Sequence, residues 1–282
     1  MLKDITLGQF FPGRSLLHRL DPRVKLVLTV LYIVIIFLAE NEFCYLAVGI
    51  FTLAMVLLSQ ISVKVILKGI KPILFVLLFT MIINLFFTKG EGEPLLSFWR
   101  IAIYQEGISR AVLMALRVVF LIVGTSVLLT YTTSPIVLTD AIESLLSPLK
   151  LIKIPVHDFA MMMTIALRFI PTLIEETDKI MNAQKARGAD FSSGSVVRRV
   201  KALVPVLIPL FVSSFKRADE LATAMECRGY RGDVGRTKYV RMKMHTRDVL
   251  VLLFFIIFGA AVVVGNYYLP TLAALLPQLF AA

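Results

Sequence analysis

Long apolar runs alternate with short polar connections along this chain, a pattern typical of a protein that crosses a membrane several times. A transmembrane helix needs about 20 mostly apolar residues, and long polar side chains at its ends can reach the interface. Five runs meet this requirement, and they predict spans at residues 24–39, 43–59, 70–87, 111–130 and 249–269.

The stretch between the fourth and fifth predicted spans, residues 131–248, follows a different pattern. Two of its pieces, residues 159–174 and 200–215, are apolar enough to suggest a transmembrane hairpin. Such a hairpin would place Arg168 in one span and Pro205 and Pro209 in the other, and it would move a basic connection to the outer side of the membrane. Because Lys and Arg in short loops are retained in the cytoplasm, we predict instead two long amphipathic helices that begin against the membrane and emerge into the cytoplasm.

The first of these long helices has the three- and four-residue spacing of an amphipathic helix, with a polar stripe opposite an apolar face. The polar stripe comprises Arg168, Thr172, Glu175, Lys179, Asn182 and Lys185, and the apolar face comprises Ile170, Leu173, Ile174, Ile180 and Met181. A shorter amphipathic helix is predicted before it, over residues 136–149.

The pattern therefore predicts an all-α integral membrane protein with about five transmembrane helices. It adds a cytoplasmic region of three amphipathic helices, of which the two long ones each end in an Arg-Gly pair. The predicted domains are a membrane domain of four spans at residues 1–130, a cytoplasmic coupling domain at 131–248, and a last span with an outer tail at 249–282.

Composition and charge agree with a membrane location. Of the 282 residues 58% are hydrophobic, and the mean hydropathy of +0.83 is too high for an ordinary soluble domain. Thirty Lys and Arg residues against 19 Asp and Glu give a formal charge of +11. Their positions predict a multi-pass protein of the plasma or inner membrane with a cytoplasmic N-terminus and an outer C-terminus. Arg198, Arg199 and Lys201 predict contacts with anionic lipids and not with nucleic acid.

Both long helices end in the same residue pattern. Asp178, Ala183, Arg187 and Gly188 of the first helix recur at identical offsets as Asp219, Ala224, Arg228 and Gly229 of the second. Glycine after the last helical residue suits a left-handed cap, which places each arginine in a final turn. Capping alone would explain one such ending. The repetition favours a second interpretation, that two arginines dock into two similar acidic grooves through paired charge-assisted bonds.

With these residues the chain resembles the transmembrane T component of energy-coupling factor transporters, the CbiQ/EcfT family. That family is marked by two Xaa-Arg-Xaa motifs at the ends of cytoplasmic coupling helices, which here are Ala186-Arg187-Gly188 and Cys227-Arg228-Gly229. The segments at residues 15–25, 167–171 and 217–220 also match, and the resemblance covers nearly the whole chain. The supporting residues on the coupling helices are Arg168, Pro171, Asp178, Arg217, Asp219 and Glu220.

The resemblance implies a non-catalytic scaffold in an importer of vitamins or other micronutrients. Its partners would be two ABC-type ATPase subunits, EcfA and EcfA', one at each arginine motif, and a small membrane S component that captures the substrate. ATP and Mg would be bound by the ATPases, and no cofactor by this chain. Independently of the resemblance, the sequence has no G-x-x-x-x-G-K-[ST] phosphate loop, so it is not a P-loop ATPase subunit itself.

Two other function classes stay open from the sequence. A secondary transporter or other polytopic protein working without ATPases would need a midplane site, usually between broken helices of paired halves, and no such repeat is evident. An intramembrane enzyme would need a nucleophile and a base, or metal ligands, inside the spans. His18, His157 and His245 have no second ligand at a suitable spacing, so no metal site is expected. For Arg117, inside the fourth span, a helix-packing role is favoured over a transport pathway.

Overall fold

The computed structural model describes residues 10–87, 96–98, 101–191, 195–232 and 242–268. Its contacts divide the chain into two compact units, one formed by residues 8–134 and 242–282 and the other by residues 1–7 and 135–241. The first unit thus joins the C-terminal helix to the N-terminal helices. The predicted three-part division at residues 130 and 248 stays a prediction.

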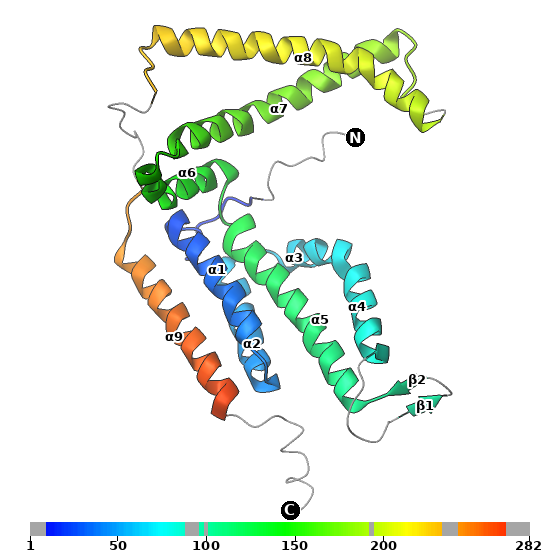
Figure 1. Cartoon of the computed structure of the whole chain (residues 1–282), viewed down its shortest axis with the longest axis vertical. Helices are drawn as coiled ribbons and strands as arrows, with labels where there is room; N and C mark the ends of the chain where they lie inside the picture. Colours follow the sequence, from blue (N-terminus) through cyan, green and yellow to red (C-terminus); the bar gives the residue numbers. More distant parts are fainter. Residues whose placement is uncertain (1–9, 88–95, 99–100, 192–194, 233–241, 269–282) are drawn as a thin grey trace, which may run out of the picture. The chain divides into compact units, whose positions relative to one another are not determined.

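The first unit is a helical bundle with a small β-hairpin (Figure 1). Its helices are α1 (Pro22–Leu38), α2 (Glu42–Ser59), α3 (Val63–Ile70), α4 (Leu74–Phe87), α5 (Gln105–Thr125) and α9 (Thr246–Tyr268). A short 3-10 turn, Lys71–Ile73, joins α3 to α4, and a π-helical segment, Ser126–Thr130, follows α5. Strands β1 (Leu96–Phe98) and β2 (Ile101–Ile103) pair antiparallel in the predicted loop between the third and fourth spans. The predicted all-α fold class is confirmed, with this hairpin as a local exception.

Length and composition support five membrane-crossing helices, although the five are not all those predicted. Four of them, Glu42–Ser59, Val63–Phe87, Gly107–Thr130 and Thr246–Tyr268, coincide with predicted spans. The fifth is Val156–Ala186, which we predict to lie along the membrane. Helix α1 has 17 residues, about 26 Å at 1.5 Å per residue against a hydrocarbon core of about 30 Å. The assignment of α1 as a span and of Val156–Ala186 as an in-plane helix therefore stays a prediction.

Helix α1 supplies the centre of this bundle. Its residues Leu28, Tyr32 and Ile36 are completely buried, and α5 and α9 pack against it, whereas α2 is reached through the side chain of Tyr32. The hydroxyl of Tyr32 lies 2.7 Å from Oγ1 of Thr52 on α2 and donates to the carbonyl of Phe120 on α5, 3.0 Å away. A buried polar group in apolar surroundings is costly unless it is paired, so these bonds fix three helices at one point.

Polar contacts join the first turn of α1 to α9 and to Thr132, just after the π-helical segment. The carboxylate of Asp248, at the start of α9, accepts the backbone N–H of Asp21 at 2.9 Å. Asp21 in turn caps α1 by accepting the N–H of Arg23 at 2.9 Å. The buried ammonium group of Lys25 donates to the carbonyl of Thr132 at 3.0 Å.

The opposite end of α1 is held in a similar way. The side-chain oxygen of Asn266 on α9 accepts the backbone N–H groups of Glu40 and Asn41 at 3.1 and 3.3 Å. Arg117 of α5 donates to the hydroxyl of Tyr45 at 2.6 Å and to the carbonyl of Ala39 at 3.2 Å. Arg117 thus joins α5 to the turn between α1 and α2, which supports the predicted helix-packing role.

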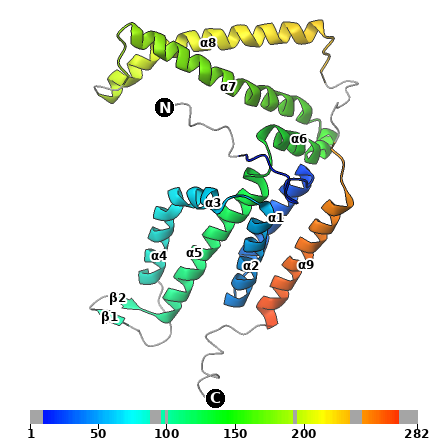
Figure 2. The same cartoon turned by 180° about the vertical axis from the view of Figure 1, so that it is seen from behind.

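The second unit contains the three predicted amphipathic helices. They are α6 (Pro135–Leu145), followed by a 3-10 segment, Ser147–Ile152, and the long helices α7 (Val156–Ala186) and α8 (Val196–Cys227). Figures 1 and 2 show α7 and α8 crossing each other. Helix α7 continues through Pro171, and α8 continues through Pro205 and Pro209.

The predicted amphipathic pattern of α7 is confirmed. All six side chains of the predicted polar stripe are exposed, whereas the five residues of the predicted apolar face are partly buried. The helical period of 3.6 residues therefore assigns the polar and apolar residues of α7 to the correct faces.

Replacing Gly124 by Ala should destabilise the first unit. The added Cβ would lie 2.1 Å from Cε1 of Tyr32, whose ring is fully buried and held by hydrogen bonds. Overpacking of this kind costs about 1–3 kcal/mol, and we expect a lower unfolding temperature of the detergent-purified protein. Gly259→Ala is the control, because its Cβ would meet only the Ile35 side chain, at 3.1 Å. Equal thermal stability of Gly124→Ala and the unmodified protein would contradict this packing.

Candidate functional site

The two Arg-Gly helix ends have the same backbone geometry. Arg187 (φ −87°, ψ 7°) and Arg228 (φ −85°, ψ 6°) are the last residues with near-helical dihedrals. They are followed by Gly188 at φ 87° and Gly229 at φ 76°, in the left-handed region. The predicted left-handed glycine cap is therefore confirmed at both ends.

The hydrogen bonds at these ends form a Schellman motif in each helix. At the end of α7, the N–H of Gly188 donates to Lys185 at 2.9 Å and the N–H of Ala189 donates to Gln184 at 3.0 Å. At the end of α8 the corresponding bonds run from Gly229 to Glu226, at 2.9 Å, and from Tyr230 to Met225, at 3.0 Å. These bonds satisfy carbonyls that a helix otherwise leaves without a donor. Each arginine is consequently held on a well-defined end and not on a frayed turn.

Both motif arginines are exposed. All six residues of the motif tripeptides, Ala186-Arg187-Gly188 and Cys227-Arg228-Gly229, are exposed. In the part of the chain that the structure describes, neither guanidinium has a hydrogen-bond or ion-pair partner. An unpaired guanidinium on a rigid helix end retains its full set of donors for a carboxylate of another molecule.

Helices α7 and α8 run antiparallel, which places the two arginines at opposite ends of the pair. Glu176 of α7 contacts Ser213 and Arg217 of α8, whereas Gln184, further along α7, contacts Pro205, which comes earlier in α8. The C-terminal ends of the two helices consequently point away from each other, as Figure 1 shows. The candidate site is therefore two separate tips and not one pocket.

The other predicted site residues lie along the same two helices but do not form one cluster. Arg168 and Pro171 of α7 are exposed, and Asp178 is partly buried. On α8, Asp219 and Glu220 are exposed. Of the six supporting residues, Arg217 is the one whose side chain bonds to the other long helix in the contacts described.

Arg217 belongs to a polar cluster that the sequence did not reveal. Its Nη2 lies 3.0 Å from Oε2 of Glu176, and the hydroxyl of Ser213 donates to Oε1 of the same carboxylate. The guanidinium carbon lies 6.0 Å from the ring centre of Phe169, a cation–π distance. Ser213 and Arg217 are four residues apart on α8 and so share a helix face. That spacing was visible in the sequence, but their partner on α7 was not.

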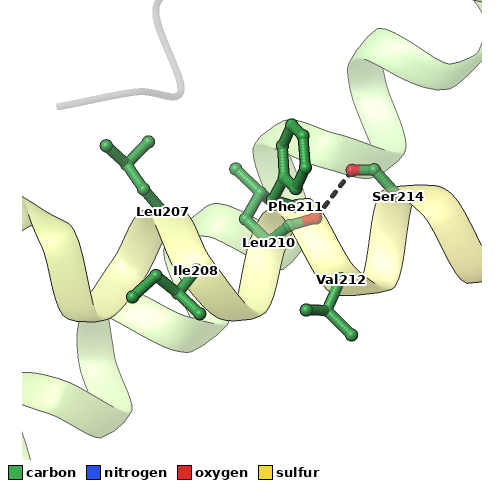
Figure 3. A pocket seen from close by; sticks show the side chains of 6 residues that line it. All are labelled: Leu207, Ile208, Leu210, Phe211, Val212 and Ser214. Atoms are coloured by element: carbon green, nitrogen blue, oxygen red, sulfur yellow. Dashed lines mark hydrogen bonds between the residues drawn. The ribbon is translucent and has the colours of Figure 1, made fainter.

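Helix α8 also carries an apolar hollow on its surface, shown in Figure 3. Its volume is about 420 Å³, and it is lined by Leu207, Ile208, Leu210, Phe211, Val212 and Ser214. The hydroxyl of Ser214 donates to the carbonyl of Leu210 at 2.7 Å within the same helix, so it presents no free donor to the hollow. Phe211 and Val212 are 65% and 63% exposed. Apolar side chains exposed to this extent mark a surface that lipid or another protein covers.

The described residues hold no group of three His, Cys, Asp or Glu side chains that could bind a metal ion. His157 bonds to Glu143 at 2.8 Å, joining α7 to α6, and His18 bonds to Ser15 at 2.6 Å. The expectation that the chain binds no cofactor stays a prediction.

Comparison with known proteins gives consistent matches. A family model described as CbiQ, cobalt transport protein, matches residues 13–239. An energy-coupling factor transporter transmembrane protein EcfT from Ruminiclostridium cellulolyticum is 54% identical over 267 residues, covering 95% of this chain and 99% of the relative. EcfT proteins from Clostridium kluyveri and Bacillus subtilis are 53% and 49% identical, covering 90% and 92% of this chain and 93% and 97% of the relatives.

Substitutions at Gly188 should loosen the end of α7 in the order in which they disfavour a positive φ. Among the described residues nothing lies within 4 Å of a Cβ placed there, so backbone conformation alone decides. Asn tolerates the left-handed region, whereas the β-branched Val does not. We expect Gly188→Asn to retain slow amide exchange at Ala189, and Gly188→Val to lose about 1–2 kcal/mol of protection, measured by hydrogen exchange. Equal protection in the two variants would show that the cap does not depend on this conformation.

Proposed function

This chain belongs to the CbiQ/EcfT family of transmembrane components of energy-coupling factor transporters, and we propose that it couples two ATPase subunits to a substrate-binding S component. In this function it is a non-catalytic scaffold for the uptake of a vitamin or another micronutrient. ATP and Mg bind to the ATPases, EcfA and EcfA', and substrate specificity belongs to the S component. The observation that carries the proposal is the pair of identical arginine-bearing helix ends.

The geometry of the two tips suits two separate ATPase subunits. Each tip presents one exposed arginine at the end of a capped helix, with closely similar dihedrals and equivalent hydrogen bonds. Two similar local structures fit two similar acidic grooves, and their location at opposite ends of the α7–α8 pair keeps those grooves on different subunits. A planar guanidinium bound by a carboxylate in two parallel hydrogen bonds would give each contact both strength and direction.

The surface of α8 supports a membrane-embedded partner. In its hollow around Phe211 the lining is apolar except for Ser214, whose hydroxyl is already bonded within α8. We assign this surface to the S component, whose transmembrane helices are apolar and can cover it in the bilayer. Arg198, Arg199 and Lys201, exposed in the first turns of α8, would meet anionic lipid headgroups, with about 1 kcal/mol for each residue near the surface.

The proposed orientation places both arginine tips in the cytoplasm, where the ATPases have access to ATP. The N-terminus is then inside and the C-terminus outside, as the distribution of Lys and Arg indicates. Helices α7 and α8 accordingly do not form a transmembrane hairpin, even though α7 is long and apolar enough to cross the membrane.

Replacing either motif arginine by alanine should weaken ATPase binding. A hydrogen bond to a charged group contributes about 1.5–3 kcal/mol, which is roughly a ten- to a hundredfold change in affinity. We expect Arg187→Ala and Arg228→Ala each to reduce transport and the double variant to abolish ATPase binding or coupling. Lysine should rescue poorly, because an ammonium keeps the charge but not the planar fork. The measurements are the ATPase retained on purification and substrate-dependent uptake into proteoliposomes.

The matched control for these variants lies at the other end of α8. Arg198→Ala and Arg199→Ala remove exposed arginines from the same helix but not from its tip, and they should leave the complex intact. If the Arg187→Ala/Arg228→Ala protein holds both ATPases and transports normally, the coupling role of the motif is wrong.

Cysteine labelling tests the proposed orientation. Cysteines at Asp190 or Ser195, in the connection between α7 and α8, should resist an impermeant thiol reagent added outside intact cells. The background carries Cys227→Ala, because Cys227 is exposed and Ala186 occupies its place in the other motif. Glu40→Cys, in the turn predicted to lie outside, is the positive control. Outside labelling at residue 190 as fast as at residue 40 would restore the transmembrane hairpin.

A further inference from the structure

An ion pair and a hydrogen bond to the same carboxylate join α7 to α8. Nη2 of Arg217 lies 3.0 Å from the carboxylate of Glu176, which also accepts a hydrogen bond from Ser213. The two charged side chains are 31% and 24% exposed, so water screens the pair only in part. Nη1 of Arg217 is buried and has no acceptor among the described residues. Glu176 therefore supplies the carboxylate that pairs with this guanidinium.

A second polar contact joins the same helices two turns further along α7. Proline has no N–H group, so Pro209 leaves the carbonyl of Pro205, four residues before it, without its helical donor. The side chain of Gln184 on α7 donates to this carbonyl at 3.4 Å. A proline that weakens α8 thereby creates a docking point for α7.

The two contacts are separated along both helices. Gln184 follows Glu176 by eight residues on α7, and on α8 Ser213 and Arg217 follow Pro205 by eight and twelve residues, distances of about 12 to 18 Å at 1.5 Å per residue. A single contact between crossing helices acts as a pivot, because the helices can rotate about it. Two contacts at different points along the helices resist that rotation.

The ion pair also occupies equivalent positions in the repeated pattern. Arg187 follows Glu176 by eleven residues, and Arg228 follows Arg217 by eleven residues. Eleven residues are close to three full turns, about 16 Å of helix. The two members of the pair therefore lie on the same helix faces as the two motif arginines and at equal distances from them.

We propose that the Glu176–Arg217 pair and the Gln184–Pro205 contact fix the crossing of α7 and α8, and with it the separation of the two arginine tips. Glu176 and Arg217 are then positioning residues, which act on ATPase coupling through Arg187 and Arg228. A displacement of one tip by its ATPase is transmitted to the other tip, and to the surface of α8, instead of being lost in a change of the crossing angle. This proposal deepens the proposed function and rests on it, because it takes the two arginine tips to be the sites that bind the ATPases.

The separation of the tips can be measured without the ATPases. Spin labels on Asn182→Cys and Thr223→Cys occupy exposed, equivalent positions five residues before each arginine. The full-length protein, with Cys44→Ala and Cys227→Ala, is placed in lipid nanodiscs, and the distance distribution is recorded by pulsed electron paramagnetic resonance. We expect a narrow distribution, and a roughly twofold broader one after Glu176→Gln, which removes the charge but keeps the shape.

Charge reversal separates the ion pair from a general loss of stability. The Glu176→Arg/Arg217→Glu double variant restores an ion pair between the same positions and should recover most of the narrow distribution. Gln184→Leu should broaden the distribution without touching the pair. The matched controls are Glu175→Gln and Lys216→Gln, which remove neighbouring exposed charges and should change nothing.

Coupling provides the second readout. In complexes that retain both ATPases, Glu176→Gln should raise the ATP hydrolysed per substrate transported by roughly threefold or more, and charge reversal should lower it again. An unchanged distance distribution in both Glu176→Gln and Gln184→Leu overturns the inference, as does a broad distribution that charge reversal does not narrow. A wrong proposed function would give a different result: the Arg187→Ala/Arg228→Ala protein would retain both ATPases, whatever the width of the distance distribution.

Discussion

The constraint on which this structure depends is that backbone N–H and C=O groups need partners where water is scarce. In a bilayer an unpaired group costs several kcal/mol, so helices satisfy their own backbone and leave only their ends and their proline sites open. In the first unit the side chain of Asp21 accepts a backbone N–H group at the start of α1, and that of Asn266 accepts two between α1 and α2. In the second unit glycine caps close α7 and α8, and Gln184 serves the carbonyl freed by Pro209. The proposed functional contacts of the second unit occur at such helix ends and proline sites.

Much of the fold followed from periodicity and turn chemistry. The predicted spans at 43–59 and 249–269 agree with the helices to within three residues and the span at 111–130 to within six, and the polar stripe of α7 was assigned to the correct residues. Both caps could be predicted because glycine adopts a positive φ without a steric cost. These features are local, and each is determined by residues within one or two turns of one another.

Other features were missed, and the one that matters most for the site depends on residues distant in the sequence. The helix of the third span begins at Val63, seven residues before the predicted start, and a turn at Pro72 divides it into an amphipathic helix and an apolar one. The π-helical segment at Ser126–Thr130 and the β-hairpin leave no mark on apolar periodicity. The Glu176–Arg217 pair joins residues 41 positions apart, and nothing in either helix alone identifies the partner. The repeated pattern did place the two residues at equivalent positions, because each precedes a motif arginine by eleven positions.

The energy of the ion pair limits what it can do alone. Exposed pairs contribute about 0–1 kcal/mol, and this pair is only partly shielded, whereas coupling between two sites typically requires about 1–3 kcal/mol. One such pair is too weak to keep two long helices at a fixed angle against the force of an ATPase. The Gln184 contact must therefore contribute as well. This explains why the crossing has two polar contacts: each is modest, but their separation of about 12 to 18 Å along the helices turns them into a constraint on angle. Removing one contact should consequently widen the range of angles that the helices sample, without separating them.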